Sequence, residues 1–200
     1  MPGATIEFFW DPASPFTYLA STQINTIARD CGAELVWKPF LLGKAFEASG
    51  NRPPVSVPAK GKHMFIDLRR WATLYGVPLQ FPKSFQVNSV SPERAAIAAA
   101  NAGKGPEFAK ALMSAHWGEG RDISQPDELK AIAASLGLDG DAILAATQDA
   151  TVKDVLKANT EEAVKRGVFG APTFFVGDEM FWGNDRLELL RAYLKGKLAA

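Results

Sequence analysis

An apolar segment near the start of the chain leads directly into a proline-marked helix start, and this junction constrains the fold more than any other feature. Residues 5–10 (TIEFFW) have the apolar and aromatic composition of a buried strand. Ser14 follows at an N-cap position, with Pro15 in the first helical turn. The segment therefore predicts a strand whose carboxyl end meets the positive end of a helix, a place where reacting groups collect in α/β proteins. There the Ser14 hydroxyl either caps the helix or holds a thiolate.

The order of the expected elements indicates strands at both ends of the chain and helices between them. A strand over 5–10, a helix over 14–30 and a strand over 33–40 form a βαβ unit with a parallel strand pair. A proline-rich loop at 51–58 then opens a block without β-rich runs. The helices expected in this block cover 60–75, 92–102, 107–116, 125–136, 141–150 and 152–166, with Ser91 as a cap.

Strands return near the end of the chain. The pattern over 173–182 predicts a strand–turn–strand hairpin with Gly177-Asp178 in the turn, followed by a helix over 185–197 capped by Asn184 or Asp185. The outline βαβ, helical block, ββα is the order of a thioredoxin-like core with a large all-helical insertion. We expect residues 1–41 and 167–200 to form the thioredoxin-like domain and residues 42–166 to form the inserted helical domain.

Composition argues against several kinds of partner. Lys+Arg and Asp+Glu both number 22 and no basic block occurs, so nucleic acid is not expected as a partner. Cys31 is the single cysteine and the two histidines, His63 and His116, are far apart, so neither a disulfide nor a metal site is expected. No apolar run approaches the ~20 residues that span a bilayer, and no signal-peptide pattern opens the chain. These features predict a cytoplasmic protein without a membrane partner.

A second motif, Gly170-Ala171-Pro172-Thr173, precedes the third strand. In one interpretation Pro172 merely starts that strand. In the other it is the proline that is usually cis in a thioredoxin-type core, where it faces the start of the first helix. The backbone N–H and C=O of Ala171 then pair with an extended, peptide-like ligand. The order of the surrounding elements favours the ligand-binding interpretation.

Taken together, the two motifs resemble the DsbA-like branch of the thioredoxin superfamily, and within it the kappa-class glutathione transferases and the glutathione-dependent isomerases related to them. The resemblance covers nearly the whole chain. Besides residues 14–20 and 168–173, it is carried by residues 51–52, 67–72, 75–78, 117–120 and 177–187. The chain departs from the disulfide oxidoreductases of this branch, because Ser14 and Thr17 stand where those proteins carry Cys-x-x-Cys. With no thiol left to exchange a disulfide, the chain must borrow one, and the resemblance implies glutathione as the cofactor.

The resemblance also implies the site residues. Ser14 is the expected catalytic residue, whose hydroxyl donates a hydrogen bond to the glutathione sulfur and, with the helix N-terminus, favours the thiolate. In the simpler interpretation Ser14 only caps its helix. The other expected glutathione-binding residues are Lys60, Ala171, Pro172, Trp182, Gly183, Asn184 and Asp185. The expected substrate-binding residues are Lys44, Asn51, Arg52 and Phe85. For a single Lys or Arg the alternative is a solvated surface charge, and for Asn184 and Asp185 it is a capping role alone.

The activity implied by the resemblance is reversible isomerisation of 2-hydroxychromene-2-carboxylate to trans-o-hydroxybenzylidenepyruvate, an aromatic α-keto acid, in naphthalene-type catabolism. Glutathione would act by reversible thiolate addition and be regenerated. A kappa-like transferase, which leaves glutathione in the product, is the first alternative. A non-catalytic thioredoxin-like binding module is the second. The resemblance further implies a homodimer and a small-molecule partner.

Overall fold

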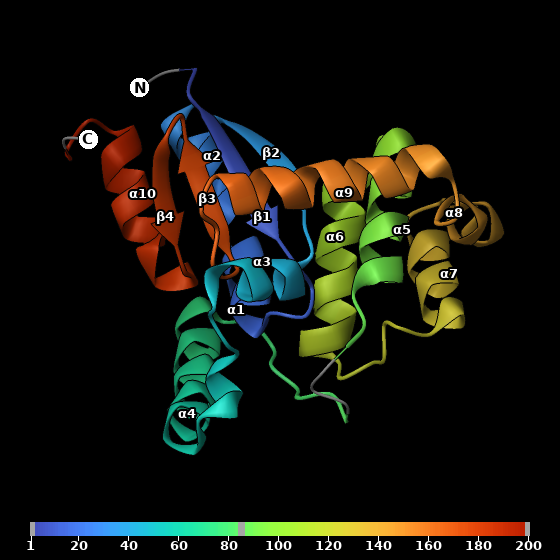
Figure 1. Ribbon diagram of the computed structural model, residues 1–200, viewed down its shortest axis with the longest axis horizontal. Coiled ribbons are helices and arrows are strands. Elements are labelled where there is room, and N and C mark those ends of the chain that lie inside the picture. Colours follow the sequence, from blue (N-terminus) through green and yellow to red (C-terminus); the bar gives the residue numbers. More distant parts are fainter. Residues whose placement is uncertain (1–2, 84–86, 199–200) are drawn as a thin grey trace.

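A computed structural model describes residues 3–83 and 87–198, and within them a single mixed sheet forms the centre of the molecule (Figure 1). Its strands are β1 (Thr5–Trp10), β2 (Glu34–Pro39), β3 (Thr173–Val176) and β4 (Glu179–Trp182), in the spatial order β2-β1-β3-β4. β1 runs parallel to β2, whereas β3 is antiparallel to both β1 and β4. This arrangement and the helices below confirm the predicted thioredoxin-like α/β fold with a large helical insertion.

Helices cover both faces of the sheet and extend away from one edge of it (Figure 1). The first two, α1 (Pro15–Ser21) and α2 (Ile24–Cys31), follow β1, and α10 (Leu187–Leu194) follows β4. The remaining helices are α3 (Leu42–Ser49), α4 (Pro58–Tyr75), α5 (Val90–Asn101), α6 (Gly105–Met113), α7 (Pro126–Ser135), α8 (Gly140–Ala146) and α9 (Ala150–Lys165). Short turns of other helical types lie at Pro54–Ser56 (η1), Ser114–Gly118 (η2) and Asn184–Arg186 (η3).

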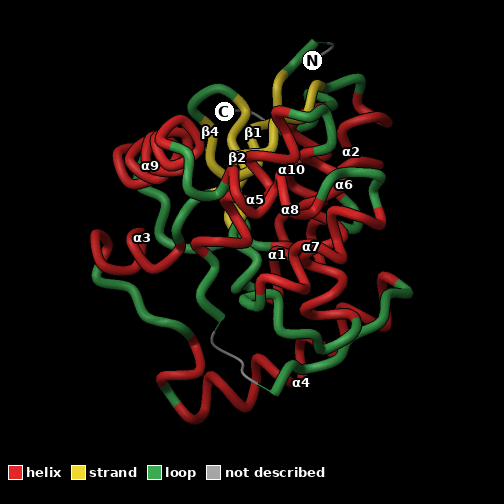
Figure 2. The backbone as a smooth tube through the Cα atoms, turned by 90° about the vertical axis from the view of Figure 1, so that its right-hand side faces the viewer, coloured by secondary structure: helices red, strands yellow, loops and turns green. Residues whose placement is uncertain are grey.

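Alternation along β1 sends neighbouring aromatic side chains to opposite faces of the sheet. Phe8 belongs to the larger apolar cluster, where its ring stacks on Phe174 at a centroid distance of 4.9 Å. Phe9 belongs to a smaller cluster with Phe40 and Phe175, which α3 and α9 cover. In both backbone views α3 lies beside α9, and α4 projects from the far end of the molecule (Figures 1 and 2). Both faces of β1 are therefore buried over residues 8–10, which are all aromatic.

The prediction of one helix over 14–30 is wrong, because the chain forms two helices there. Three residues before the second helix, Ser21 Oγ donates to Tyr18 O at 2.7 Å, and Thr22 Oγ1 donates to Leu19 O at 2.7 Å. Hydroxyl groups that take up carbonyl oxygens in this way compete with the helical backbone bonds. The helix ends at Ser21 as a result, and α2 begins at Ile24.

α3 was not expected from the sequence, and α5 begins two residues before the expected start at Pro92. Neither helix has a side-chain cap from its own N-cap residue. Asp11 instead accepts a hydrogen bond from the Leu42 backbone N–H at 2.8 Å and another from Ser89 Oγ at 3.2 Å. A carboxylate more than thirty residues away in sequence thus stabilises these helix starts, and local sequence carries no signal of it.

The other expected elements form, with shifted ends. The late hairpin is confirmed over 173–182 with Gly177 at positive φ in its turn. The last helix differs, because Asn184–Arg186 forms a 3₁₀ turn before α10 and neither Asn184 nor Asp185 acts as a side-chain cap. The division into a thioredoxin-like domain and an inserted domain stays a prediction, and the larger apolar cluster contains residues of both.

Among the described residues, no helix is both long enough and apolar enough to cross a membrane. The same part of the chain contains no group of three or more His, Cys, Asp or Glu side chains placed to hold a metal ion.

A partly buried ion-pair cluster fixes α9 to the sheet. Glu7 of β1 accepts hydrogen bonds from Lys38 Nζ of β2 at 2.5 Å and from Arg166 at 2.6 Å. Both cations also contact Glu162 of α9, and the Arg166 guanidinium lies 3.7 Å from the centroid of the Phe175 ring. Burial tends to raise the pKa of Glu7, but the hydrogen bonds from Lys38 and Arg166 outweigh it and lower that pKa.

We predict that Glu7→Gln lowers the free energy of unfolding at pH 7 by about 2 kcal/mol, since it weakens two charge-assisted hydrogen bonds. Because folding lowers the pKa of Glu7, its contribution is present above the ordinary glutamate range and is lost as the pH falls through the lowered value. The variant should therefore lose less stability on acidification than the wild type does. Urea unfolding at several pH values measures both effects.

Glu161→Gln is the matched control on α9, since Glu161 is exposed and faces Lys157 at 3.8 Å. Equal losses in the two variants would contradict the assignment of the stabilising role to the buried cluster.

Candidate functional site

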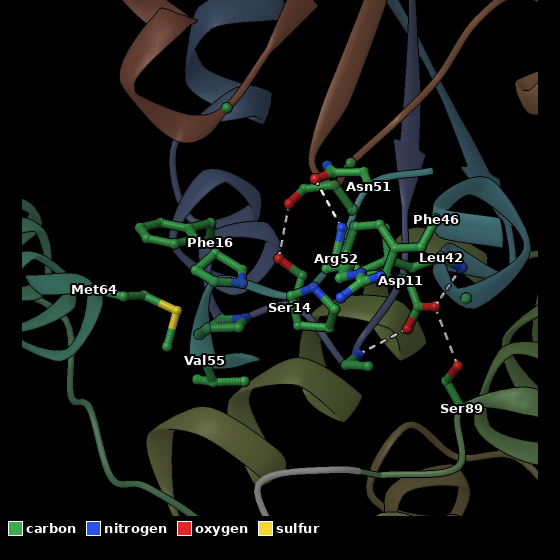
Figure 3. Close-up of a pocket in the computed structure, with 18 of the residues that line it drawn as sticks. Asp11, Ser14, Phe16, Leu42, Phe46, Asn51, Arg52, Val55, Met64 and Ser89 are labelled. Carbon is green, nitrogen blue, oxygen red and sulfur yellow. Dashed lines mark hydrogen bonds between the residues drawn. The ribbon is translucent and has the colours of Figure 1, made fainter. Parts of the chain in front are cut away.

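A cavity of about 1070 Å³ lies where the carboxyl end of β1 meets the start of α1. The walls come from segments distant in sequence: the start of α3, the loop at 51–55, the first turns of α4, the segment 87–90, and the loops at 170–171 and 182–186. Apolar side chains such as Phe16, Val55 and Met64 line it together with polar ones (Figure 3). The predicted site residues within the described ranges, Pro172 excepted, line this one cavity.

Ser14 is the N-cap of α1 and is 5% exposed. Its Oγ accepts a hydrogen bond from Thr17 N at 3.3 Å and donates one to Ala171 O at 2.8 Å. The hydroxyl therefore caps the helix and at the same time joins α1 to the loop before β3 (Figure 3). Its single proton can serve one acceptor at a time.

The Ala171–Pro172 peptide bond is cis, as expected for a thioredoxin-type core. Pro172 O accepts a hydrogen bond from Gly183 N at 2.9 Å, which brings the loop at 182–185 beside it. The Ala171 carbonyl takes the Ser14 hydroxyl, while the Ala171 N–H makes no hydrogen bond to the described residues. One backbone donor is thus free at the cavity wall.

The segment after β4 forms the adjoining wall. The Trp182 indole packs against Gly170 so closely that a Cβ on Gly170 would lie 2.9 Å from indole Cε2. Gly183 has φ 107° and ψ 152°, a conformation that only glycine adopts readily. This turn places Asn184 in the interior at 3% exposed, with its Nδ2 lacking a partner in the described part of the chain, and leaves Asp185 exposed. A buried amide donor and an exposed carboxylate therefore stand side by side.

The basic residues that were expected to bind ligands lie at the rim of the cavity. Lys60 is exposed in the first turn of α4. Lys44 is exposed on α3, where it pairs with Glu47 at 2.7 Å. Arg52 is exposed and forms no ion pair with any residue from 3–83 or 87–198. All three cations therefore border the cavity, and Lys44 is the one already paired with a carboxylate.

Asn51 has a positioning role that the sequence did not predict. Its Nδ2 donates to Phe169 O at 2.8 Å, and its Oδ1 accepts from Arg52 N at 2.8 Å. The amide therefore joins the loop after α3 to the loop before β3, and both loops contribute residues to the cavity lining. Phe85, the remaining expected substrate contact, lies outside the described residues.

Sequence reasoning missed the carboxyl pair beneath the cavity, Asp11 and Glu93. Asp11 is 2% exposed, and its Oδ1 accepts a hydrogen bond from Ala13 N at 2.8 Å in addition to those from Leu42 and Ser89. Glu93 of α5 is fully buried, and neither carboxyl oxygen has a donor within the described residues. The signal that pointed to Asp11 was its position directly after a buried strand. No feature of the sequence pointed to Glu93, which lies in an alanine-rich helix.

Burial governs the titration of this pair. Burial raises the pKa of Asp11, whereas the hydrogen bonds from Ala13, Leu42 and Ser89 lower it by a smaller amount. Burial also raises the pKa of Glu93 well above its usual range, and the neighbouring Asp11 charge adds to the shift. Both shifts disfavour a second negative charge in this buried pair.

Two buried aromatic side chains make supporting hydrogen bonds near the cavity. Trp117 Nε1 donates to Pro12 O at 2.7 Å, and Tyr18 OH donates to Pro78 O at 2.8 Å. Trp117 and Tyr18 are both buried. Trp117 thus holds the β1–α1 loop, Tyr18 joins α1 to the segment after α4, and neither lines the cavity.

The fold and the cavity together define a thioredoxin-fold protein in which hydroxyl groups occupy the positions of a redox dithiol. Cys31, the single cysteine, lies at the end of α2 and is not part of the cavity lining. The model of the DSBA-like thioredoxin domain matches residues 5–195, and the chain belongs to that family.

Within the family the chain is similar to isomerases and to kappa-class transferases. It is 38% identical over 192 residues to a 2-hydroxychromene-2-carboxylate isomerase of Sphingobium xenophagum, covering 95% of this chain and 97% of the relative. It is 30% identical to the human glutathione S-transferase kappa 1, covering 96% and 91% of the two chains. A solved structure of a 2-hydroxychromene-2-carboxylate isomerase superposes with a TM-score of 0.88 at 30% identity, covering 96% and 95%.

We predict that Gly183→Ala costs about 1–3 kcal/mol of folding free energy, since an L-residue is strained at this φ and its Cβ would collide with Asp185 Oδ1. Gly43→Ala is the matched control, because a Cβ there meets nothing within 4 Å and alanine favours the α3 helix. Denaturant unfolding of both variants measures the difference. A Gly183→Ala variant as stable as Gly43→Ala would contradict the strained turn.

Proposed function

We propose that this protein is a glutathione-dependent isomerase that interconverts 2-hydroxychromene-2-carboxylate and trans-o-hydroxybenzylidenepyruvate in aromatic catabolism. The observation that carries the proposal is the Ser14 hydroxyl at the start of α1, directed to the cis-proline loop in a cavity whose lining contains no thiol. The relatives of known isomerase activity, which match over nearly the whole chain, support the choice of reaction.

The cavity residues fit glutathione, a short peptide with a terminal amine and two carboxylates. The free Ala171 N–H suits a peptide carbonyl, in the manner of an added strand. The unpartnered Asn184 Nδ2 suits a carboxylate oxygen, and the exposed Asp185 carboxylate suits an ammonium group. We assign Lys60, which is exposed in the first turn of α4 and lines the cavity, to the second carboxylate. When bound, the glutathione thiolate supplies a nucleophile that adds reversibly to the β-carbon of a conjugated α-keto acid.

The Ser14 hydroxyl has to change its acceptor in order to serve a thiolate. Its proton points to Ala171 O in the structure, at 2.8 Å. Turning the proton to sulfur would leave that carbonyl without a donor, unless a peptide N–H of the ligand takes its place. Binding of a peptide backbone along Ala171 therefore frees Ser14 for the sulfur. The α1 N-terminus adds its partial positive charge, and each unit by which the thiol pKa falls corresponds to about 1.4 kcal/mol.

The other half of the cavity suits a flat, anionic substrate. Phe16, Val55 and Met64 offer apolar contacts to an aromatic ring. Arg52 is unpaired within the described ranges and can take a carboxylate with two parallel hydrogen bonds, with Lys44 nearby on α3. We assign these two cations to the charge of the keto acid, and Asn51 to holding the loop that presents Arg52.

Transferase activity is the second candidate, favoured by the kappa-class relatives. The same Ser14 and Ala171 contacts would serve it. The two candidates differ in the fate of glutathione, which the isomerase regenerates and the transferase loses to the product. A cytoplasmic location, where glutathione is reduced, and a homodimer belong to the same proposal.

We predict that ring opening, followed by absorbance, requires glutathione, and that Ser14→Ala lowers kcat/KM at least about 100-fold. The thiolate absorbance of bound glutathione should also titrate at higher pH in this variant, because the stabilising hydrogen bond is gone. Mass spectrometry should recover glutathione unmodified. Full activity without a thiol would refute the proposal, and a stable conjugate at high turnover would replace it with the transferase.

Thr17→Val is the matched control, because it also removes a hydroxyl from α1. Thr17 Oγ1 is buried with no hydrogen-bond partner in the described part of the chain, so its loss leaves no donor or acceptor unpaired. The variant should keep most of the activity. Ser14→Ala also loses about 1 kcal/mol of helix capping, and unfolding measurements correct for that loss.

We further predict that Asp185→Asn weakens glutathione binding about tenfold, as expected for loss of one charge-assisted hydrogen bond. Asp178→Asn is the control, because Asp178 is exposed in the β3–β4 turn and is not part of the cavity. Isothermal titration calorimetry with glutathione measures both affinities. A wild type that binds no glutathione would instead favour a non-catalytic binding module.

A further inference from the structure

The carboxylate of Asp11 joins three walls of the cavity. One oxygen accepts from Ala13 N, next to Ser14, and the other accepts from Leu42 N at the start of α3 and from Ser89 Oγ before α5. Figure 3 shows Asp11 between these groups. An ionised carboxyl group has about four acceptor positions, so three donors leave one position open. This saturation argues that Asp11 organises the walls and does not act as a base.

Glu93 lies one helical turn after Ser89, since its N–H donates to Ser89 O at 2.9 Å while Ser89 Oγ donates to Asp11. It is fully buried, and no N–H or O–H group of the described residues donates to it. A carboxylate in such a place would lose its hydration without compensation. Asp11 is the charged group that acts on it, and Asp11 is itself an acceptor. Two adjoining buried carboxyl groups are stable only when they share a proton.

The cations on the surrounding elements are engaged elsewhere. Lys44 of α3 pairs with Glu47, Lys110 of α6 lies over the Trp37 ring, and Lys130 of α7 pairs with Asp141 of α8. On α9, Lys157 faces Glu161, and on β2, Lys38 pairs with Glu7. The next residue on α5, Arg94, forms no ion pair with Glu93, and its Nε has no partner among the described residues. Glu93 therefore has no counter-charge in the described part of the chain.

We propose that Glu93 is a positioning residue for the substrate half of the cavity: it remains a neutral carboxylic acid and donates its proton to Asp11, which then holds the α1, α3 and α5 walls together. Loss of the proton places two negative charges in a buried site, and the walls that carry Lys44 and residues 87–90 separate. Ser14 is also held by its backbone bond to Asp11 O and its side-chain bond to Ala171 O, and the 182–185 loop by Pro172 O, so glutathione binding changes less than substrate binding. The catalytic part of this inference rests on the proposed isomerase function.

The first test needs neither glutathione nor substrate. Between the ordinary glutamate pKa of about 4.3 and the raised value, the folded protein holds one proton more than the unfolded chain. The folding equilibrium constant of the wild type therefore contains a component that falls up to tenfold per pH unit as the pH rises through this interval. Glu93→Gln, whose amide can donate to Asp11 at every pH, should lack that component. Glu107→Gln on exposed α6 surface is the control and should retain it.

The second test measures KM for the chromene carboxylate against pH. In the wild type and in Glu107→Gln, KM should rise at the alkaline end by tenfold or more, with the glutathione dissociation constant changing less than twofold. In Glu93→Gln the rise should disappear. Parallel curves for Glu93→Gln and the wild type, in either test, would overturn the proposal. A wild type without isomerase activity would refute the proposed function instead, and the unfolding comparison would still decide whether Glu93 holds the proton.

Discussion

The hydrogen bonds to the Asp11 carboxylate are the interactions on which the cavity depends. Asp11 follows β1 directly and accepts hydrogen bonds from three segments that the chain brings in from elsewhere: its own loop, the start of α3 and the start of α5. Helices α3 and α5 have no side-chain cap of their own, and Asp11 compensates from a distance. The Asp11 carboxylate is a buried charge, and its loss of hydration is unfavourable. In our proposal, the neutral Glu93 carboxyl group offsets this loss by donating its proton to Asp11.

In the neighbouring part of the site, the Ser14 hydroxyl likewise determines how two segments are joined. Ser14 gives its one proton to Ala171 O while accepting from Thr17 N. In an oxidoreductase of this fold, thiols at the two positions would form a disulfide. Hydroxyl groups cannot form a disulfide. In the proposed reaction, the Ser14 hydroxyl instead stabilises the negative charge on the sulfur of a bound thiol. In the proposed reaction the fold and the helix N-terminus are the same as in those oxidoreductases, and a bound thiol supplies the sulfur.

Much of the fold could be predicted because its signals are local. The strand at residues 5–10 and the hairpin around Gly177-Asp178 depend on neighbouring residues, and both were predicted from the sequence. Most of the errors come from interactions between residues that are distant in sequence. Local hydroxyl groups ended α1 early, but α3 and the first turn of α5 depend on Asp11, and Asn51 depends on Phe169 O. No pattern in residues 42–49 or around position 51 contains that information.

The sequence by itself determined the class of the protein and the chemistry it lacks. The order of strands and helices specifies the core, and Ser14 and Thr17 rule out a dithiol, because residue identity needs no coordinates. Only the tertiary structure decided which polar groups are free and which are engaged. It showed that Asn51 joins two loops, that Asn184 Nδ2 and Arg52 remain available within the described residues, and that Glu93 adjoins Asp11. The reason is physical: a hydrogen-bonding group is defined by its partners, and here the partners lie tens of residues apart along the chain.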